Sequence, residues 1–235
     1  MKNITTIALR KLCLSFMLIF LTANVAATCL DSVVLVHGNT GTPSDWDNTY
    51  DLLKAKNYQD SEIFRPSWGG SSASSNNHSG SEETPVKNAI NSALASSCSG
   101  KIDIIAHSMG VTLAAQQVIK LGKSNKVDAF IGIAGAYRGL WTCGAYPWNV
   151  WTATCGTNGL SVSSPFLDWL YGKSIANRVY SIKSWSDPIV CGSGTCRVNG
   201  VHSSQIANEN GTYSYTLGHF GLQTYTASKQ YELIK

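Results

Sequence analysis

Three residues of the types needed for nucleophilic catalysis stand far apart in this chain: Ser108, Asp187 and His219. A serine hydroxyl is a weak nucleophile until a neighbouring base takes its proton. A histidine can be that base, while a carboxylate fixes the tautomer of the imidazole and stabilises the imidazolium. The three residues therefore predict a triad in which Ser108 attacks, His219 transfers protons and Asp187 orients the histidine.

The surroundings of Ser108 favour a nucleophile at this position. The β-branched run 102–105 predicts a buried strand, and 112–120 predicts a helix. Between them, small residues stand two places before and two places after the serine, at Ala106 and Gly110. A strand that reverses directly into a helix needs small flanking residues and exposes its central side chain. The alternative is a serine that only caps the helix.

An oxyanion formed at Ser108 would need two hydrogen-bond donors. The backbone N–H of Met109, at the start of the expected helix, is the first candidate. The second is the N–H of Asn39, in the Gly-rich turn that follows the apolar strand expected at 32–37. Both amides then lie beyond the carboxyl ends of the strands, where ligands bind in open α/β sheets.

Other acids and histidines compete for these roles. Asp128 begins an expected strand at the wrong end of the sheet, and Asp168 lies in an aromatic-rich segment. His202 is the main rival base, but it follows no recognisable strand. Three further histidines have other expected roles. His107 should point away from Ser108, and His37 should support the turn after the first strand. His78 is expected in a mobile Gly/Ser/Asn-rich loop at 67–81.

The elements that must position these groups alternate along the chain. Continuous apolar runs predict strands at 32–37, 62–64, 102–105, 127–134 and 177–185. Helical patterns follow at 44–54, 84–97 and 112–120, and a last helix is expected from 220 to the end. Alternation of this kind predicts an α/β fold with a mostly parallel sheet and helices on both faces. No linker divides the chain, so one compact domain is expected.

Aromatic residues gather in the segment 139–172 and just before it. They could line an apolar wall for an acyl chain or form a small lid, or they could simply pack a core. We predict that substrate contacts come from six of them: Tyr137, Trp141, Trp148, Trp151, Phe166 and Trp169.

The first 27 residues predict a signal peptide that precedes a domain at 28–235. Basic residues are followed by a short apolar run, and Val25-Ala26-Ala27 has the small residues of a cleavage site. The whole chain carries a formal charge of +4, with basic residues in the leader and no basic stripe elsewhere, so nucleic acid is not expected as a partner. The protein is expected to be secreted, either extracellular or periplasmic.

Six cysteines remain outside the leader, an even number that is typical of disulfides in an exported domain. Position in the sequence favours three pairs. Cys191–Cys196 would enclose a small loop, Cys143–Cys155 would bracket a Trp- and Pro-bearing excursion, and Cys29–Cys98 would join residues that each precede an expected strand. A zinc site is the alternative, but the spacing lacks a C-x₂-C pair and no pair of histidines accompanies it. We expect neither a metal nor a cofactor.

These motifs together resemble the small bacterial secreted lipases of the α/β-hydrolase superfamily. The resemblance covers most of 33–221, and its clearest segments are Val34–Asn39, Ile105–Val111, Asp187–Val190 and Gly218–His219. Ala106 takes the place of the first glycine in the usual G-x-S-x-G motif around the serine, and in this the chain resembles the minimal lipases of Bacillus. Two other segments, Asn57–Phe64 and Gly135–Leu140, look more like lipase-like extracellular polyhydroxybutyrate depolymerases. The resemblance implies the α/β-hydrolase fold, the serine, acid and histidine named above in that chain order, and an oxyanion hole from the two amides.

The function predicted from the residues and the resemblance is carboxylester hydrolysis of acyl lipids through an acyl-enzyme, by a monomer with transient contact to lipid interfaces. A polyester depolymerase is the second enzymatic hypothesis. A non-catalytic binding protein with the same fold is the alternative from another class.

Overall fold

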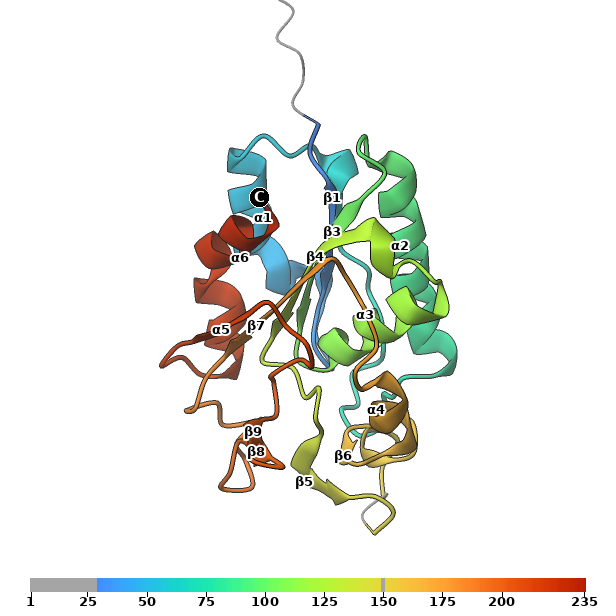
Figure 1. Cartoon of the computed structure of the whole chain (residues 1–235), viewed down its shortest axis with the longest axis vertical. Helices are drawn as coiled ribbons and strands as arrows, with labels where there is room; N and C mark the ends of the chain where they lie inside the picture. The colour runs from blue at the N-terminus through green and yellow to red at the C-terminus, as the bar shows by residue number, and fades with distance from the viewer. Residues whose placement is uncertain (1–28, 149–150) are drawn as a thin grey trace, which may run out of the picture.

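One parallel sheet of six strands forms the centre of the computed structural model, which describes residues 29–148 and 151–235 (Figure 1). The strand order is β10-β7-β4-β3-β1-β2. The strands are β1 (Ser32–Val36), β2 (Ile63–Phe64), β3 (Ile102–His107), β4 (Val127–Ile133), β7 (Arg178–Lys183) and β10 (Gly211–Ser214). Every neighbouring pair in this sheet runs parallel, as the sequence predicted.

Helices cover both faces of the sheet (Figure 1). On one face lie α2 (Glu83–Ser96) and α3 (Met109–Lys120), and on the other lie α1 (Asp47–Ala55), α5 (His219–Tyr225) and α6 (Ala227–Ile234). Alternate residues of β1 enter two different cores: Val34 and Val36 pack with α2 and α3, while Val33 and Leu35 pack on the opposite side. Burial of both faces explains why this strand is apolar at every position.

Three differences from the expected elements have physical causes. Helix α3 begins at Met109, directly after Ser108, so strand and helix meet without a linker. The last helix is interrupted at Thr226, whose hydroxyl donates to Leu222 O. Strand β10 was not predicted, because an edge strand of exposed and half-buried residues, Gly211–Ser214, lacks the apolar run of its neighbours.

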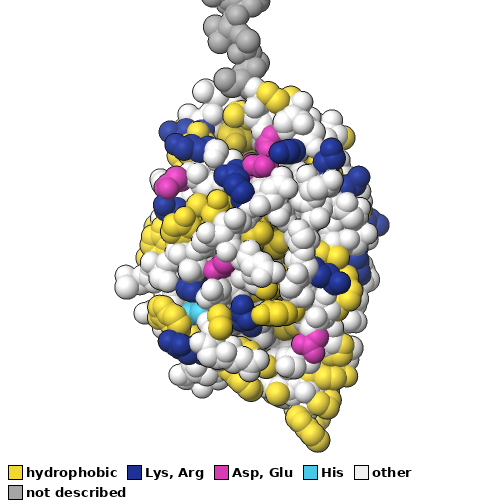
Figure 2. All heavy atoms as spheres, viewed as in Figure 1, with side chains coloured by type: hydrophobic (Ala, Val, Ile, Leu, Met, Phe, Trp, Pro, Cys, Tyr) yellow, Lys and Arg dark blue, Asp and Glu magenta, His cyan; other side chains and the backbone are white. Residues whose placement is uncertain are grey.

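The aromatic-rich segment forms a small annex beyond the carboxyl ends of the strands. It contains β5 (Leu140–Ala145), β6 (Ser161–Val162) and α4 (Pro165–Leu170), and near it lies the hairpin of β8 (Arg197–Val198) and β9 (Val201–His202). Figure 2 shows hydrophobic side chains gathered at this end of the molecule.

The three predicted disulfides are present: Cys29–Cys98, Cys143–Cys155 and Cys191–Cys196. The first joins the segments that lead into β1 and β3, at the amino edge of the sheet. The predicted signal peptide lies outside the described residues. Within 29–148 and 151–235, no helix combines the length and apolar character that crossing a bilayer would require.

Candidate active site

Ser108 occupies a strained turn between β3 and α3. Its backbone has φ +53° and ψ −129°, a conformation that L-residues rarely adopt. The Ser108 N–H donates to Ile133 O at 2.8 Å, which fixes the turn to β4. At Gly110, an added Cβ would lie 2.2 Å from His37 O, so only glycine lets the new helix pass beside the first strand. The turn therefore has the geometry of a nucleophile elbow.

His219 and Asp187 meet Ser108 in a continuous hydrogen-bonded row. The distance from His219 Nε2 to Ser108 Oγ is 2.9 Å, and that from His219 Nδ1 to Asp187 Oδ2 is 2.8 Å. With Nδ1–H donated to the carboxylate, Nε2 is free to accept the serine proton. The Asp187 and His219 side chains are almost fully buried, which keeps competing water away from the row.

The second oxygen of Asp187 is also satisfied. Oδ1 accepts the backbone N–H groups of Ile189 at 2.8 Å and Val190 at 3.0 Å. Burial by itself would raise the pKa of Asp187, but the hydrogen bond and charge of His219, together with these two amides, hold that pKa below its ordinary value. Asp187 is therefore ionised wherever the protein works near neutral pH.

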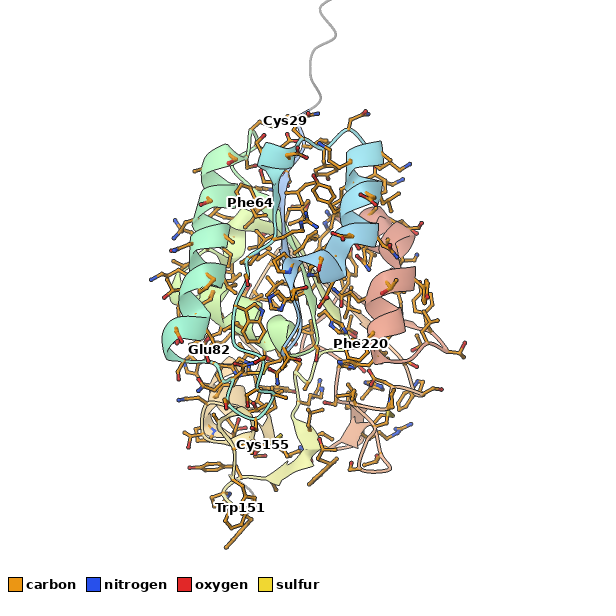
Figure 3. All side chains as sticks on the ribbon, turned by 180° about the vertical axis from the view of Figure 1, so that it is seen from behind. Cys29, Phe64, Glu82, Trp151, Cys155 and Phe220 are labelled. Carbon is orange, nitrogen blue, oxygen red and sulfur yellow. A yellow bond between two sulfur atoms is a disulfide. The ribbon has the colours of Figure 1, made fainter. Side chains whose placement is uncertain are left out.

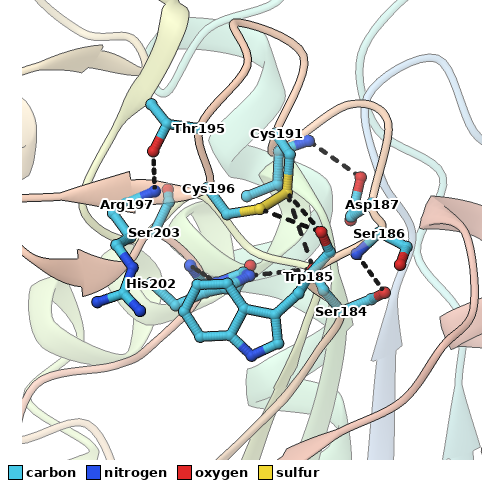
Figure 4. The surroundings of a disulfide bond; sticks show 12 residues. Ser184, Trp185, Ser186, Asp187, Cys191, Thr195, Cys196, Arg197, His202 and Ser203 are labelled. Carbon is cyan, nitrogen blue, oxygen red and sulfur yellow. Dashed lines mark hydrogen bonds between the residues drawn. A yellow bond between two sulfur atoms is a disulfide. The ribbon is translucent and has the colours of Figure 1, made fainter.

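The loop that carries Asp187 is closed by a disulfide (Figure 4). The Cys191 N–H donates to the backbone oxygen of Asp187 at 3.0 Å. Cys191 is bonded to Cys196, and both sulfurs lie against Trp185 O, at 3.8 and 3.5 Å. The disulfide thus stabilises the turn that presents the carboxylate to His219.

The rival acids and the rival base lie elsewhere. Asp128 pairs with Arg178 at 2.7 Å near the amino edge of the sheet, and Asp168 is exposed on α4. His202 Nε2–H donates to Ser184 O at 3.0 Å, and its Nδ1 accepts the Ser204 N–H at 3.1 Å. Both ring nitrogens of His202 are therefore occupied by backbone groups.

His107 supports His219 rather than competing with it. Its Nε2–H donates to the backbone oxygen of His219 at 3.1 Å, and its ring lies 6.1 Å from that of Phe220. Burial, and then the neighbouring His219, lower the pKa of His107 to about 3. The ring therefore stays neutral and holds the first residue of α5 in place.

The backbone N–H groups of Asn39 and Met109 donate no hydrogen bond within the described part of the chain. Asn39 lies in the turn after β1 and lines one cavity with Ser108, and Met109 directly follows Ser108 at the start of α3. Two unpaired amides near a serine hydroxyl are of the type that a developing oxyanion requires.

A network of side chains holds Asn39 in place. Its Nδ2–H donates to Ala73 O at 2.8 Å, and its Oδ1 accepts from Asn76 Nδ2 at 2.6 Å. The buried amide of Asn76 also donates to Gly70 O and accepts the Gly70 N–H. Thr154 Oγ1 lies 2.5 Å from both Ala73 O and Asn76 O, which ties the loop to the annex.

Sequence reasoning missed Asn76, because a Gly/Ser/Asn run gives no signal for a buried amide. It also placed His78 in a mobile loop, and this was wrong. His78 is buried and stacked on Phe166 with ring centroids 4.1 Å apart. Its Nδ1–H donates to Asn158 O at 2.8 Å, and Nε2 lies 2.7 Å from Thr112 Oγ1, so the loop is anchored to α3. His37, as expected, supports the opening turn, where Nδ1–H donates to Gly38 O.

A cavity of about 510 Å³ opens over Ser108 and His219. Its floor is the turn after β1, and Ala73 forms one side. Its rim carries two exposed apolar side chains, Ile189 at 45% and Phe220 at 69% (Figure 3 labels Phe220). Ile189 follows Asp187 closely in the sequence, and Phe220 comes directly after His219. This proximity in the sequence is the signal that could have identified both residues.

None of the six aromatics predicted to contact substrate lines this cavity. After β4 the chain leaves the central sheet and forms β5 and β6 in the annex, so these aromatic side chains lie away from the cavity over Ser108. Tyr137 is buried beside a second cavity, Phe166 and Trp169 border a third, and Trp141 donates to Arg197 O at 2.8 Å. Trp148 and Trp151 are 83% and 87% exposed. Figure 3 shows Trp151 at the far end of the annex.

Two groups in the described residues have the types and proximity of metal ligands. One is Cys191, Cys196 and His202, but its two sulfurs are joined in a disulfide. The other contains Asp31, Asp103 and Asp128 at the amino edge of the sheet. Neither group includes Ser108, His219 or Asp187.

Comparison with known proteins identifies the family and supports the fold. The family profile described as Lipase (class 2) matches residues 31–232. No curated protein sequence matches the chain. Solved structures do match: Aspergillus fumigatus lipase B has 18% identity and a TM-score of 0.56, over 83% of this chain and 49% of that one. This chain therefore spans about half the length of the fungal lipase.

Two further structures are similar. A metagenome-derived lipolytic enzyme from a study of LipS and LipT has 13% identity and a TM-score of 0.59, covering 87% of this chain and 94% of that one. Bacillus licheniformis lipase BlEst2, in its propeptide form, has 11% identity and a TM-score of 0.57, covering 88% and 51%. At these identities the likeness shows the fold alone, and it confirms the predicted α/β-hydrolase architecture.

Proposed function

Since the chain belongs to the class 2 lipase family of carboxylic ester hydrolases, we propose that it cleaves acyl-lipid esters through a triad of Ser108, His219 and Asp187. The observation that carries this proposal is the unbroken row from serine hydroxyl to buried carboxylate, at 2.9 and 2.8 Å, beneath an open cavity. A structural serine at a helix start would need neither the strained turn nor the histidine.

The reaction follows from this geometry. Ser108 Oγ attacks the ester carbonyl carbon while its proton passes to His219 Nε2. The carbonyl π electrons move to the oxygen, and this oxyanion accepts the N–H groups of Asn39 and Met109. The C–O bond to the alcohol then breaks, and His219 returns the proton to the leaving oxygen. Water repeats the sequence on the acyl-enzyme and releases the acid.

The surface around the cavity supports action at a lipid interface. Ile189 and Phe220 present apolar side chains at its mouth, and Trp148 and Trp151 project from the annex. Tryptophan is favoured at lipid–water boundaries, where its ring is apolar and its N–H is polar. We propose transient adsorption of a monomer, since one chain supplies every group of the row.

Export is the proposed route to that substrate. The basic, apolar and small-residue segments of 1–27 have the order of a signal peptide, and three disulfides suit an oxidising compartment. Cleavage after Ala27 is measured directly by sequencing the amino terminus of the protein recovered from culture medium or periplasm.

The test of the function is hydrolysis of p-nitrophenyl esters by wild type, Ser108→Ala and a control, Ser92→Ala, at an exposed position on α2. We expect Ser108→Ala to lower kcat by about 10⁴-fold or more, and the control to match wild type. Equal turnover by the two variants would show that Ser108 is not the nucleophile. A fluorophosphonate that fails to label wild type would instead support a non-catalytic binding protein.

A polyester depolymerase remains the second proposal, because two exposed tryptophans could also adsorb to a solid polymer. The two substrates are separated by comparing triglyceride turnover with the clearing of a polyhydroxybutyrate suspension. Faster triglyceride turnover supports the lipase proposal.

A further inference from the structure

A second cavity, of about 400 Å³, lies on the other side of the end of β4. Its walls come from three elements that meet only in the fold. They are the loop after β4, which contributes Tyr137 and Arg138, the helix α4 with the residues that flank it, and the β8–β9 hairpin. No residue lines both this cavity and the one over Ser108.

The wall of this cavity contains a polar group that no protein atom pairs. Tyr137 is 1% exposed, and its hydroxyl makes no hydrogen bond within the described residues. The hydroxyl oxygen is not among the fully enclosed unpaired atoms, and Tyr137 lines the cavity. The Tyr137 hydroxyl is therefore available to donate to a ligand in the cavity.

Arg138 adds a cation with donors to spare. Its Nε–H donates to Gln205 O at 2.9 Å, and the guanidinium carbon lies 5.4 Å from the centre of the Tyr171 ring. The Nη groups donate to nothing within the described residues, so most of the planar fork remains available. Such a fork matches a carboxylate in geometry as well as in charge.

The rest of the wall is apolar or strained. Leu167 and Val198 are buried and offer a surface for a hydrocarbon body. Ser163 has φ +58°, an uncommon conformation for serine, and its hydroxyl makes no hydrogen bond within residues 29–148 and 151–235. Residues with strained backbone gather at ligand sites. Asn199 and Gly200, both with positive φ, close the hairpin tightly, and Asn199 lines the cavity.

We propose that this cavity binds an organic carboxylate with an apolar body, held by the Arg138 guanidinium and the Tyr137 hydroxyl. Asp168 lines the opposite side and is exposed. Its charge opposes a second negative group, so the site favours monoanions over dicarboxylates. The proposal does not rest on the chemistry of Ser108, because the two cavities share no residue.

The experiment is titration of the ¹⁵N-labelled protein with sodium octanoate, followed by backbone amide shifts. We expect saturable shifts at Tyr137, Arg138 and Asn199. Arg138→Gln should raise Kd by about tenfold or more, because it removes a charge-assisted fork. Tyr137→Phe should raise Kd by about three- to tenfold, and Asp168→Asn should lower it by a few-fold.

Neutral 1-octanol is the matched probe, since it keeps the apolar chain and lacks the charge. We expect it to bind at least about tenfold more weakly than octanoate. Shifts confined to the turn after β1 and to Ile189 would mean that octanoate binds only over Ser108, and would overturn the proposal. An unchanged Kd in both Arg138→Gln and Tyr137→Phe would do so too, and the near-isosteric Tyr137→Phe keeps the test valid if the arginine variant misfolds.

Discussion

Asp187 and Asp103 are both almost fully buried, at opposite edges of one sheet, and their pKa values move in opposite directions. Asp187, at the carboxyl edge, has a lowered pKa although burial opposes it. Asp103, in β3 near the amino edge, has a pKa raised well above its ordinary value, first by burial and then by neighbouring acids. Burial alone therefore does not decide what a carboxyl group can do.

The partners of the two groups account for the difference. Asp187 accepts from His219 and from two backbone amides, so both of its oxygens are paired. Asp103 Oδ1 accepts one amide, Ala129 N–H at 2.9 Å, and its Oδ2 has no partner. Its close neighbours, Asp31 and Asp128, are acids. The carboxyl edge stabilises the charged form of its buried acid, whereas the amino edge disfavours the charged form of its own.

The first prediction sets these two acids against each other by the same isosteric change. Asp187→Asn should lower kcat by about 10⁴-fold, because the amide favours the wrong tautomer of His219. Asp103→Asn should leave kcat within about twofold of wild type, since it lies at the other edge of the sheet. Ester turnover and circular dichroism of both variants measure this. A comparable loss of kcat in the two, with both folded, would remove the functional distinction between the edges.

The second prediction concerns the disulfide at the amino edge. Cys29–Cys98 spans a sequence separation of 69 residues, and the loop-entropy relation assigns such a closure about 4 kcal/mol. The Cys29→Ala/Cys98→Ala double variant should lose up to that free energy of unfolding in urea. Its kcat at 25 °C should stay near that of wild type, because no residue of the serine row changes. A large fall in kcat without a change in stability would show that the amino edge acts on the site directly.

The residues at the carboxyl edge of the sheet could be predicted from the sequence, because a buried parallel strand is an apolar run whose end is visible in the sequence. Apolar runs placed Ser108 and Asp187 just beyond strand ends, and the start of the expected last helix placed His219; the structure brings all three together. Their roles as a triad remain a prediction. The directions of side chains in the annex could not be predicted, since no periodicity in the sequence indicates where Trp141 and Trp148 point.

The same limit applies to groups defined by their partners. Asn76 stands in a polar run, and only the fold shows that its amide clamps Asn39. The unpaired oxygen of Asp103 is likewise invisible in the sequence, where that residue is one polar position in an apolar strand. Sequence patterns predicted the sheet and its edge, whereas hydrogen-bond partners across loops required coordinates.

The third prediction sharpens the picture of the carboxyl edge as a pre-arranged site. Asn76→Asp keeps the size of the side chain but cannot donate to Asn39 Oδ1, so the proposed oxyanion amide should lose its fixed position. We expect kcat to fall by about ten- to a hundredfold with KM little changed, because only the transition state needs that donor. The control is Asn177→Asp at the amino edge, where the side chain donates to Asp128.

An Asn76→Asp variant with raised KM and unchanged kcat would contradict the positioning role, because it would indicate altered ground-state binding instead. A fall in kcat of equal size in Asn177→Asp would show a general loss of order rather than an effect on the oxyanion donor.

The smallest expected effect is the pH dependence of stability, and its sign differs between the two acids. Between the ordinary pKa of 3.8 and its raised value, folded Asp103 keeps a proton that the unfolded chain has released, so this group lowers stability as pH rises. Asp187, with a lowered pKa, contributes stability that is present above 3.8 and lost as pH falls through its folded value. Asp103→Asn should therefore be more stable than wild type at pH 7, because the amide does not ionise, and the difference should nearly vanish at pH 3. Asp187→Asn should lose stability over the same interval. Urea unfolding at pH 3, 5 and 7 measures the free energy of unfolding of both variants. If this free energy changed with pH in the same way in both variants, the two edges of the sheet would not differ in their effect on a buried carboxyl group.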